Sequence, residues 1–302
     1  MKPWLRTTLF VLLNAGLLLG AAVASLDWGA QARSKRRIEV DLRPLPDGVG
    51  ESSPQRGRYL FVTRGCAGCH GSRGEGSLVV DDGQGMRVVA PTIAPGPGSS
   101  VAGYAAADWD RVIRHGIKPD GTPVLIMPSE DTARLTDADL RSLVRHLGTL
   151  PPAARPVAAV VRLPFAARMA YALGLMPDAA ARIDHAAPAP APVDEGVSME
   201  HGRYVADLCR GCHGEQLSGG RVPSGPPDWP PAANLTPGPD GLLPRYAALD
   251  DFRRLLRRGS RPDGSTIGPA MPIGSLGALN DTDLAALHLY LRSLAPRAPG
   301  GG

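Results

Sequence analysis

The four cysteines of this 302-residue chain all lie in two copies of one pentapeptide. CAGCH begins at Cys66 and ends at His70, and CRGCH begins at Cys209 and ends at His213. Two thiols separated by two residues can each form a thioether with a vinyl-derived carbon of a porphyrin, and the histidine that follows then faces the iron. The pattern therefore predicts covalently attached haem c at both copies.

Three other uses of paired cysteines fit the sequence less well. A closed zinc site needs four ligands, whereas one pentapeptide supplies three and the two together supply six. A thioredoxin-like redox pair would lie in an alternating strand and helix pattern, which neither copy shows. Structural disulfides are disfavoured because no cysteine lies outside the pentapeptides.

The residues around the two pentapeptides repeat in the same order. A Gly-Arg-Tyr triplet precedes each copy, at 57–59 and 202–204. A Pro-Gly-Pro segment, a Pro-Asp-Gly turn, a Met-Pro pair and a final segment with leucines at helical spacing follow each copy. The chain is therefore predicted to be a tandem duplication of one haem-binding unit.

The repeat also selects candidates for the second axial iron ligand, because a shared ligand must occur in both copies. Each of the five other histidines either faces a different residue in the other copy or lies between the copies. Met127 and Met271 do match, since each precedes a proline and they lie 57 and 58 residues after His70 and His213. We predict that both methionines ligate iron, against the alternative that they pack in the core. Coordination by His and Met leaves no open position on the iron, so the site would transfer electrons.

Each unit is predicted to contain three helices joined by long Gly- and Pro-rich loops, which makes the fold class all-α. Short helices over 57–66 and 202–209 would lead into the haem sites, and middle helices over 108–114 and 250–258 would end at glycines. Thr136 and Asn280 are suitable N-caps for the final helices, whose apolar residues recur at helical spacing.

The N-terminal segment has an apolar run over 9–25 that no charged residue interrupts. With its flanks this run is long enough to cross a bilayer, near the minimum of about 17 residues. Small residues at 22–24 and 30–32 offer cleavage sites, but the run exceeds the roughly 15 residues typical of a cleaved signal. We expect an uncleaved anchor, with a cleaved signal peptide as the alternative. The basic cluster over 33–37 would favour the cytoplasmic side, but covalent haem attachment in bacteria takes place outside the cytoplasmic membrane.

Between the two copies lie an apolar stretch over 157–176 and an Ala- and Pro-rich stretch over 186–194. Arg162, Pro164 and Arg168 argue against a membrane span in the first stretch. We expect a short helix that packs across the two units, with a membrane-surface helix as the alternative. The second stretch is typical of a stiff linker.

The net charge of +4 includes the basic residues that flank the N-terminal segment, so the folded units are nearly balanced. We interpret the arginines around the second middle helix as a solvated face or as counter-charge for haem propionates, rather than as a docking patch for an acidic partner. Nucleic-acid binding is not expected, since no recognised motif or broad basic surface supports it. These arginines are Arg253, Arg254, Arg257, Arg258 and Arg261.

In the order of these motifs, each half resembles the class I cytochromes c. The match covers about 53–150 and 199–294, and it is most similar to membrane-anchored dihaem cytochromes c that accept electrons from periplasmic dehydrogenases. The resemblance implies two tandem cytochrome c domains, with each Gly-Arg-Tyr glycine near the C-terminal helix of its own unit. It implies thioether links at Cys66, Cys69, Cys209 and Cys212, proximal ligands His70 and His213, and distal ligands Met127 and Met271.

The expected domain order follows from these observations. It comprises an anchor or signal over 1–32, a linker over 33–52, cytochrome c domain 1 over 53–150, an interdomain linker with a short helix over 151–197, cytochrome c domain 2 over 198–295, and a flexible tail over 296–302.

The expected function is electron transfer by two covalently bound haem c groups, without enzymatic activity of the chain's own. The donor would be a periplasmic dehydrogenase or another protein, and the acceptor a soluble cytochrome or a terminal oxidase. The haem domains would face the periplasm from the cytoplasmic membrane, or be soluble there after signal cleavage. A dihaem enzyme such as a cytochrome c peroxidase, or a subunit that anchors a dehydrogenase to the membrane, remains the alternative.

Overall fold

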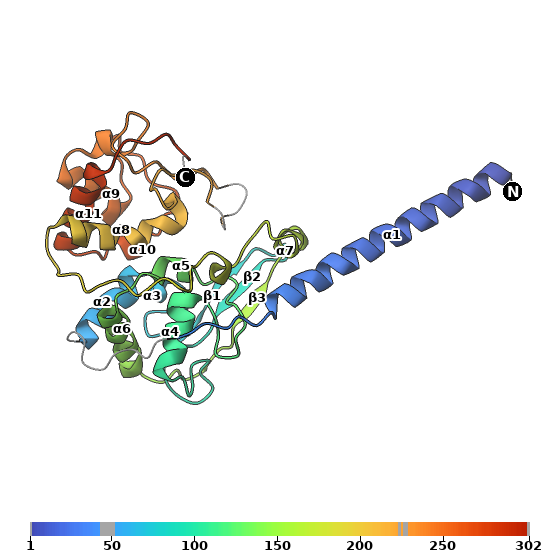
Figure 1. Cartoon of the computed structure of the whole chain (residues 1–302), viewed down its shortest axis with the longest axis horizontal. Helices are drawn as coiled ribbons and strands as arrows, with labels where there is room; N and C mark the ends of the chain where they lie inside the picture. Colours follow the sequence, from blue (N-terminus) through green and yellow to red (C-terminus); the bar gives the residue numbers. More distant parts are fainter. Residues whose placement is uncertain (1, 43–51, 223–224, 226–228, 301–302) are drawn as a thin grey trace.

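The computed structural model describes residues 2–42, 52–222, 225 and 229–300. Figure 1 shows a long N-terminal helix that projects from a body made of two lobes. This helix, α1, comprises Pro3–Ser34, and it is the one helix in the described ranges that is long and apolar enough to cross a membrane. None of its most apolar 18-residue window is buried in the protein. The part of the predicted linker over 43–51 lies outside the described residues.

The first lobe carries the CAGCH sequence and surrounds one hydrophobic cluster that includes Leu60, Phe61, Leu140, Leu143 and Leu147. Its helices are α2 (Pro54–Thr63), α3 (Cys66–His70), α4 (Ala106–His115), α5 (Ser129–Thr132), α6 (Asp137–Thr149), α7 (Phe165–Ala172) and the 3-10 turn η1 (Ala179–Ala181). Its strands are β1 (Ser77–Asp81), β2 (Arg87–Ala90) and β3 (Val160–Arg162).

The second lobe carries the CRGCH sequence and has its own cluster, which includes Leu217, Leu255, Leu284, Leu287 and Leu291. Its elements are α8 (Met199–His213), the 3-10 turn η2 (Leu243–Tyr246), α9 (Leu249–Arg258), α10 (Ile273–Leu276) and α11 (Asp281–Ser293). Within the segment predicted to be a flexible tail, the described residues 296–300 contact this lobe, where Asn234 donates to the Arg297 carbonyl at 2.8 Å.

The fold is mostly helical, but the prediction of an all-α chain missed one small sheet. Strands β1, β2 and β3 pair antiparallel in that order; β1 and β2 form a hairpin, and β3 is a valine-rich segment from much further along the chain, where Val160 pairs with Val89. β-branched residues favour such a pleated surface. The strands are only three to five residues long, so their local periodicity was too short to distinguish them from loops.

Matched helix pairs form the centre of each lobe. α2 packs on α6, and α8 packs on α11. Gly57 and Gly202 lie at the crossings, where a Cβ would come within 2.7 Å of the Cβ atoms of His146 and Tyr290 respectively. Only glycine allows the backbones to approach this closely, which agrees with the contact that the resemblance implied.

The predicted caps and helix ends agree with the structure, with one difference between the lobes. Thr136 Oγ1 accepts from the Asp139 N–H at 3.2 Å, and Asn280 Oδ1 accepts from the Asp283 N–H at 2.7 Å. The helix before CRGCH is continuous through the motif, whereas its counterpart ends at Thr63 and a new helix begins at Cys66. Gly65 breaks it by adopting a φ of 80°.

The apolar stretch over 157–176 forms β3 and α7, and α7 packs against the end of α1. The expectation of a helix packed across the two units was therefore wrong. Arg168 Nε pairs with Asp27 at 2.8 Å, and the Arg36 guanidinium makes two bonds of 2.7 Å to Asp178. The hydrophobic pattern of the stretch gave no sign of these ion pairs, and the ion pairs are what make α1 the neighbour of α7.

Candidate haem sites and the contact between them

The two pentapeptides occupy equivalent positions in the two lobes. CAGCH forms α3, and CRGCH forms the last turns of α8. Burial raises the pKa of the first thiol in each motif, Cys66 and Cys209, to about 12. Both sulfurs are thus neutral at ordinary pH. This state does not suit a thiolate metal ligand, and an apolar environment suits a thioether.

The histidine of each motif is oriented by a backbone carbonyl. His70 Nδ1 donates to the Pro91 carbonyl at 2.8 Å, and His213 Nδ1 donates to the Ala233 carbonyl at 2.7 Å. A carbonyl can only accept, so Nδ1 carries the proton and Nε2 keeps its lone pair. Burial lowers the pKa of both imidazoles, which also favours the neutral form. A ring fixed in this way is prepared to bind a metal through Nε2.

Each matched methionine packs against the same hydrophobic cluster as the cysteine motif of its own lobe. Met127 contacts the first hydrophobic cluster, as do Cys66 and Ala67, and Met271 contacts the second cluster, as does Cys209. Both methionines are half-buried and stand directly before a short helix, α5 or α10. The residues present thus fit a haem in each lobe, with an apolar environment, a neutral histidine and a thioether sulfur. Among the described residues, no group of three or more His, Cys, Asp or Glu side chains is arranged to hold a metal ion.

The other histidines have partners elsewhere in the structure. His115 and His185 contact each other with their Nδ1 atoms 3.0 Å apart, and His201 Nε2 lies 2.7 Å from Asp283. His288 Nε2 donates to the Tyr246 carbonyl at 2.8 Å. His146 packs its ring against Phe61. These contacts give each of them a place in packing or hydrogen bonding.

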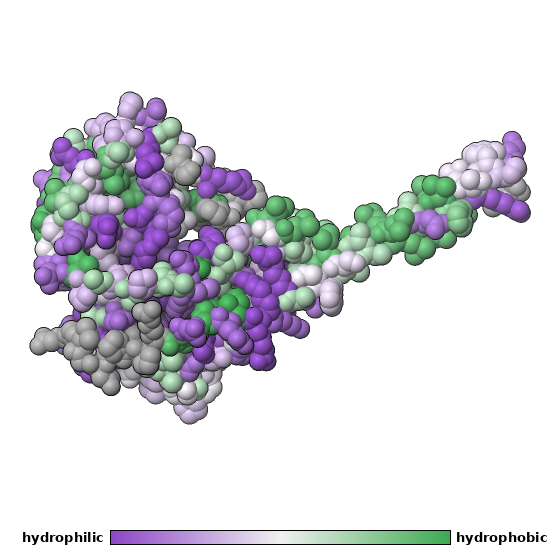
Figure 2. All heavy atoms as spheres, in the orientation of Figure 1, coloured by the Kyte–Doolittle hydropathy of each residue, from purple (hydrophilic) through white to green (hydrophobic). Residues whose placement is uncertain are grey.

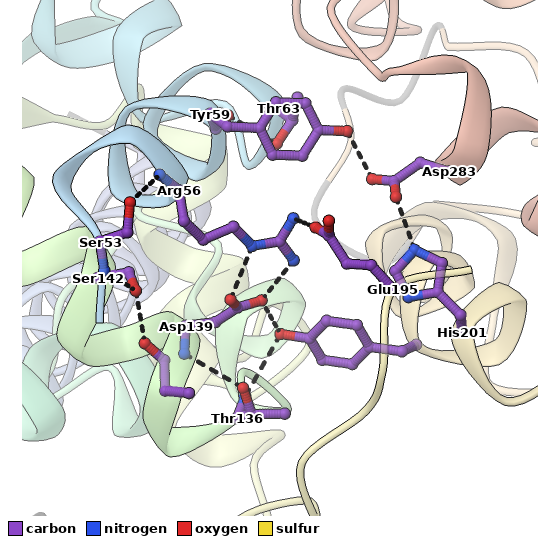
Figure 3. Close-up of polar contacts among 12 residues, drawn as sticks. Ser53, Arg56, Tyr59, Thr63, Thr136, Asp139, Ser142, Glu195, His201 and Asp283 are labelled. Atoms are coloured by element: carbon purple, nitrogen blue, oxygen red, sulfur yellow. Dashed lines mark hydrogen bonds and ion pairs between the residues drawn. The ribbon is translucent and has the colours of Figure 1, made fainter. Parts of the chain in front are cut away.

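Two tyrosines cross between the lobes in a reciprocal way (Figure 3). Tyr59 of the first lobe donates to Asp283 of the second at 2.5 Å, and its ring packs against the second hydrophobic cluster. Tyr204 of the second lobe donates to Asp139 of the first at 2.6 Å and is buried in the first cluster. Burial raises the pKa of Tyr204 to about 12, so it remains a donor.

This exchange relates equivalent positions of the repeat. Both tyrosines end a Gly-Arg-Tyr triplet, and both acceptors are the third residue of a C-terminal helix. Each acceptor also has a partner in its own lobe, at the position just before the Gly-Arg-Tyr triplet. Arg56 Nε lies 2.8 Å from Asp139, and His201 pairs with Asp283 (Figure 3). The repeat contained the signal for this contact, but the sequence alone did not show that the tyrosines pair across the lobes.

The methionine loops cross in the same manner. The residue four positions after each methionine lies against the other lobe's cysteine motif. A Cβ at Gly211, inside CRGCH, would come 2.8 Å from the Asp131 carboxyl carbon, and a Cβ at Gly65, beside CAGCH, would come 3.8 Å from Ser275 Oγ. Burial and the neighbouring Glu130 raise the pKa of Asp131 to about 7. The distal loop of each lobe thus lies beside the attachment motif of the other.

Three of the five arginines around α9 form ion pairs with acidic residues of α9 or α11. Arg253 pairs with Asp250 at 3.1 Å, and Arg254 pairs with Asp251 at 2.9 Å. Arg257 pairs with Asp281 at 2.8 Å. These pairs favour the interpretation of a solvated helix face over a docking patch.

Comparison with known proteins agrees with the site chemistry. Residues 52–147 match the family described as cytochrome c oxidase, cbb3-type, subunit III. The match covers one cytochrome c domain in the first lobe, and domains of this kind hold haem c covalently.

The chain is similar over most of its length to cytochrome c subunits and a dihaem cytochrome. It is 28% identical to the fructose dehydrogenase cytochrome subunit of Gluconobacter japonicus over 85% of this chain, and it spans 56% of that protein. It is 28% identical to a dihaem cytochrome c-type protein of Cereibacter sphaeroides over 93% of this chain and 98% of that protein. It is 25% identical to the gluconate 2-dehydrogenase cytochrome c subunit of Pantoea cypripedii, over 83% of this chain and 62% of that protein.

Proposed function

We propose that this chain is a dihaem c-type cytochrome that transfers electrons outside the cytoplasmic membrane. The observation that carries the proposal is the matched pair of CxxCH histidines, each with Nδ1 bound to a backbone carbonyl and Nε2 left free. Each lobe would be one cytochrome c domain of a tandem pair, over 53–150 and 198–295. Each haem, when bound, supplies an iron that accepts and releases one electron.

The chain's own residues would hold the two groups as the repeat predicts. Thioether links would form at Cys66, Cys69, Cys209 and Cys212, with His70 and His213 as proximal ligands and Met127 and Met271 as distal ligands. Closed coordination by these side chains would exclude substrate from the iron. The relatives are cytochrome subunits, so the dihaem peroxidase alternative is not favoured.

The crossed contacts between the lobes support electron passage from one lobe to the other. Tyr59 and Tyr204 hold the lobes together through buried or half-buried bonds to Asp283 and Asp139. Hydrogen bonds to charged groups contribute about 1.5–3 kcal/mol each, so they favour one fixed arrangement. Because each methionine loop lies beside the other lobe's motif, the two haem sites would face each other across this contact.

The N-terminal helix would remain in the mature protein as a membrane anchor. Its last turns are part of the folded body, since Ala30 is buried and Asp27 pairs with Arg168. Cleavage after Ala32 would remove both contacts. Cleavage after Ala24 would keep them and release a soluble periplasmic protein, and N-terminal sequencing of the mature chain would identify that outcome by a start at Ser25.

The electron donor would be a periplasmic dehydrogenase, and the acceptor a soluble cytochrome or a terminal oxidase. This assignment rests on the printed names of the relatives, several of which are cytochrome subunits of dehydrogenases. Co-purification in mild detergent tests it, because a bound dehydrogenase would be recovered with the cytochrome.

Spectroscopy of the purified protein tests the haem assignment. We expect two haems per chain, a far-red sulfur-to-iron band in the oxidised form and no carbon monoxide binding. Met127→Leu and Met271→Leu should each remove about half of the far-red band, and the matched control Met86→Leu should keep all of it. A high-spin haem that binds carbon monoxide in the unsubstituted protein would show that at least one site is open, and would refute the claim that both are closed.

A further inference from the structure

The junction of α1 and α7 leaves a group of apolar side chains in solvent. Trp28 is 73% exposed, Phe165 is 51% exposed, and Leu173 and Leu175 are 59% and 74% exposed. Figure 2 shows apolar residues gathered where α1 meets the body. Scattered exposed apolar residues are ordinary, but these four surround one junction, which is the point where the proposed anchor leaves the protein.

The junction is held firmly. Gly29 lies against Ala172, where a Cβ on the glycine would be 3.9 Å from the Ala172 Cβ, and the Arg33 guanidinium stacks over the Tyr171 ring at 5.5 Å. Tyr171 donates to Asp178 at 2.8 Å, and Asp178 also binds Arg36. These contacts fix α7 to α1, so the orientation of α1 in a membrane would set that of α7.

The two helices cross steeply. In Figure 1, α1 lies in the plane of the view and α7 is seen nearly end-on beside its last turns. If α1 crosses a bilayer, α7 therefore lies along the bilayer surface. Phe165 and Leu173 are eight residues apart, which places them about 80° apart around the helix axis and on one side of it.

The length of the apolar run in α1 places this junction at the level of the lipid headgroups. The apolar run over 9–25 has 17 residues. At about 1.5 Å per residue it spans roughly 26 Å, which is close to the hydrocarbon thickness of about 30 Å. Asp27 lies just beyond Leu26, which follows the run, and its partner Arg168 lies in the first turn of α7, which begins at Phe165. Phe165 would thus lie at the boundary between headgroups and acyl chains.

The charge around the junction suits an anionic surface. Lys35, the residue that follows α1, and Arg162, which ends β3 just before α7, are both exposed. Arg162 and Arg168 line a hollow beside Phe165, together with Gln84 and Leu163. Basic side chains attract anionic headgroups, and tryptophan is typical of the interface, which is where Trp28 would lie.

We propose that the α1–α7 junction is a second membrane contact, in which Trp28, Phe165, Leu173 and Leu175 enter the headgroup region of an anionic bilayer. This inference rests on the proposed anchor. It means that the anchor does not act as a loose tether, because α7 would hold the body in one orientation on the membrane. It also assigns a membrane-facing role to Lys35, one of the basic residues over 33–37 that the charge rule for topology placed on the opposite side.

Spin labelling of the full-length haem protein in phosphatidylcholine and phosphatidylglycerol vesicles tests the proposal. Single cysteines at Phe165→Cys and Leu175→Cys report on the junction, Leu17→Cys on the anchor, and Leu289→Cys on a distant exposed site that is 41% exposed. The unsubstituted protein gives the label background, since its own cysteines would be thioethers. The measurement is the ratio of collisions with oxygen, which enters lipid, to collisions with a water-soluble nickel chelate.

We expect the ratio at positions 165 and 175 to exceed that at 289 several-fold, and the ratio at 17 to be the largest. Ratios at 165 and 175 equal to that at 289, with a lipid-like value at 17, would overturn the junction contact and keep the anchor. A water-like value at 17 with raised ratios at 165 and 175 would keep the surface contact and remove the anchor. Vesicles of phosphatidylcholine alone should lower the ratios at 165 and 175, and unchanged ratios would overturn the anionic preference.

Discussion

Gly57→Ala should destabilise the first lobe through one backbone crossing. A Cβ at this position would come 2.5 Å from the carbonyl carbon of Ser142 and 2.7 Å from the Cβ of His146. Carbon atoms in contact lie about 3.5–4.0 Å apart, so α2 and α6 would have to separate by roughly 1 Å. The atoms that must move are mainly helix backbone, which cannot be displaced by a change of rotamer.

The magnitude follows from two opposing effects. Overpacking of this kind costs about 1–3 kcal/mol, and we place this site at or above the upper end because the first obstacle is backbone. Alanine also favours the helix by about 1 kcal/mol over glycine. The expected net loss of unfolding free energy is therefore about 2 kcal/mol or more.

Gly148→Ala is the matched control on the same helix pair. Gly148 lies in α6, and a Cβ there would meet no atom within 4 Å. This substitution should be neutral or stabilise the lobe by up to about 1 kcal/mol. The assay is guanidinium unfolding of the haem protein, followed by the far-red methionine band. Equal midpoints for the two variants would refute the close-approach argument.

Three further predictions follow from the contacts between elements. Tyr204→Phe removes the bond to Asp139 and should lower stability by about 1.5–3 kcal/mol, measured by chemical unfolding; no loss would contradict the role of the crossed tyrosine. Burial tends to raise the pKa of Asp178, but bonds from its arginine and tyrosine partners outweigh this and hold that pKa below its usual value. The bonds stabilise the fold above the unfolded-state pKa of about 3.9, and this stability is lost as the pH falls through the folded-state pKa. Asp178→Asn should therefore make the melting temperature depend less on pH in that acidic range. Replacing Arg253 and Arg254 by glutamine should not change the rate of electron exchange with an acidic partner, because both arginines are ion-paired on α9. The variant should match the unsubstituted protein at both low and high salt. A variant that is slower than the unsubstituted protein at low salt would support the docking patch.

Much of each candidate haem site could be proposed from the sequence because its signals are local or repeated. The spacing of Cys66, Cys69 and His70 has a chemical meaning in any fold, and comparison of the two copies selected Met127 and Met271 from seven methionines. The capping threonine and asparagine of the final helices were equally readable, since a cap depends on the next three residues.

Other parts of the fold depend on neighbours that are distant in the sequence. β1 and β2 form a short hairpin, and β3 pairs with β2 from more than seventy residues further along the chain, so no local pattern identified the third strand. The partner of α7 was assigned wrongly for a similar reason. Its apolar face required some partner, and only the folded chain shows that Asp27 and Arg36 direct α7 to the end of α1.

The sequence by itself determined which residues are candidates for chemistry in this protein: two CxxCH motifs and two matched methionines, beside an apolar segment long enough to cross a bilayer. The tertiary structure decided how the two halves meet. Tyr59 and Tyr204 were visible as repeated residues, but their exchange between lobes depends on long-range packing that buries each ring and aligns each hydroxyl with a carboxylate. A hydrogen bond needs a partner within about 3 Å, and for residues that lie far apart in the chain only the fold brings that partner within reach.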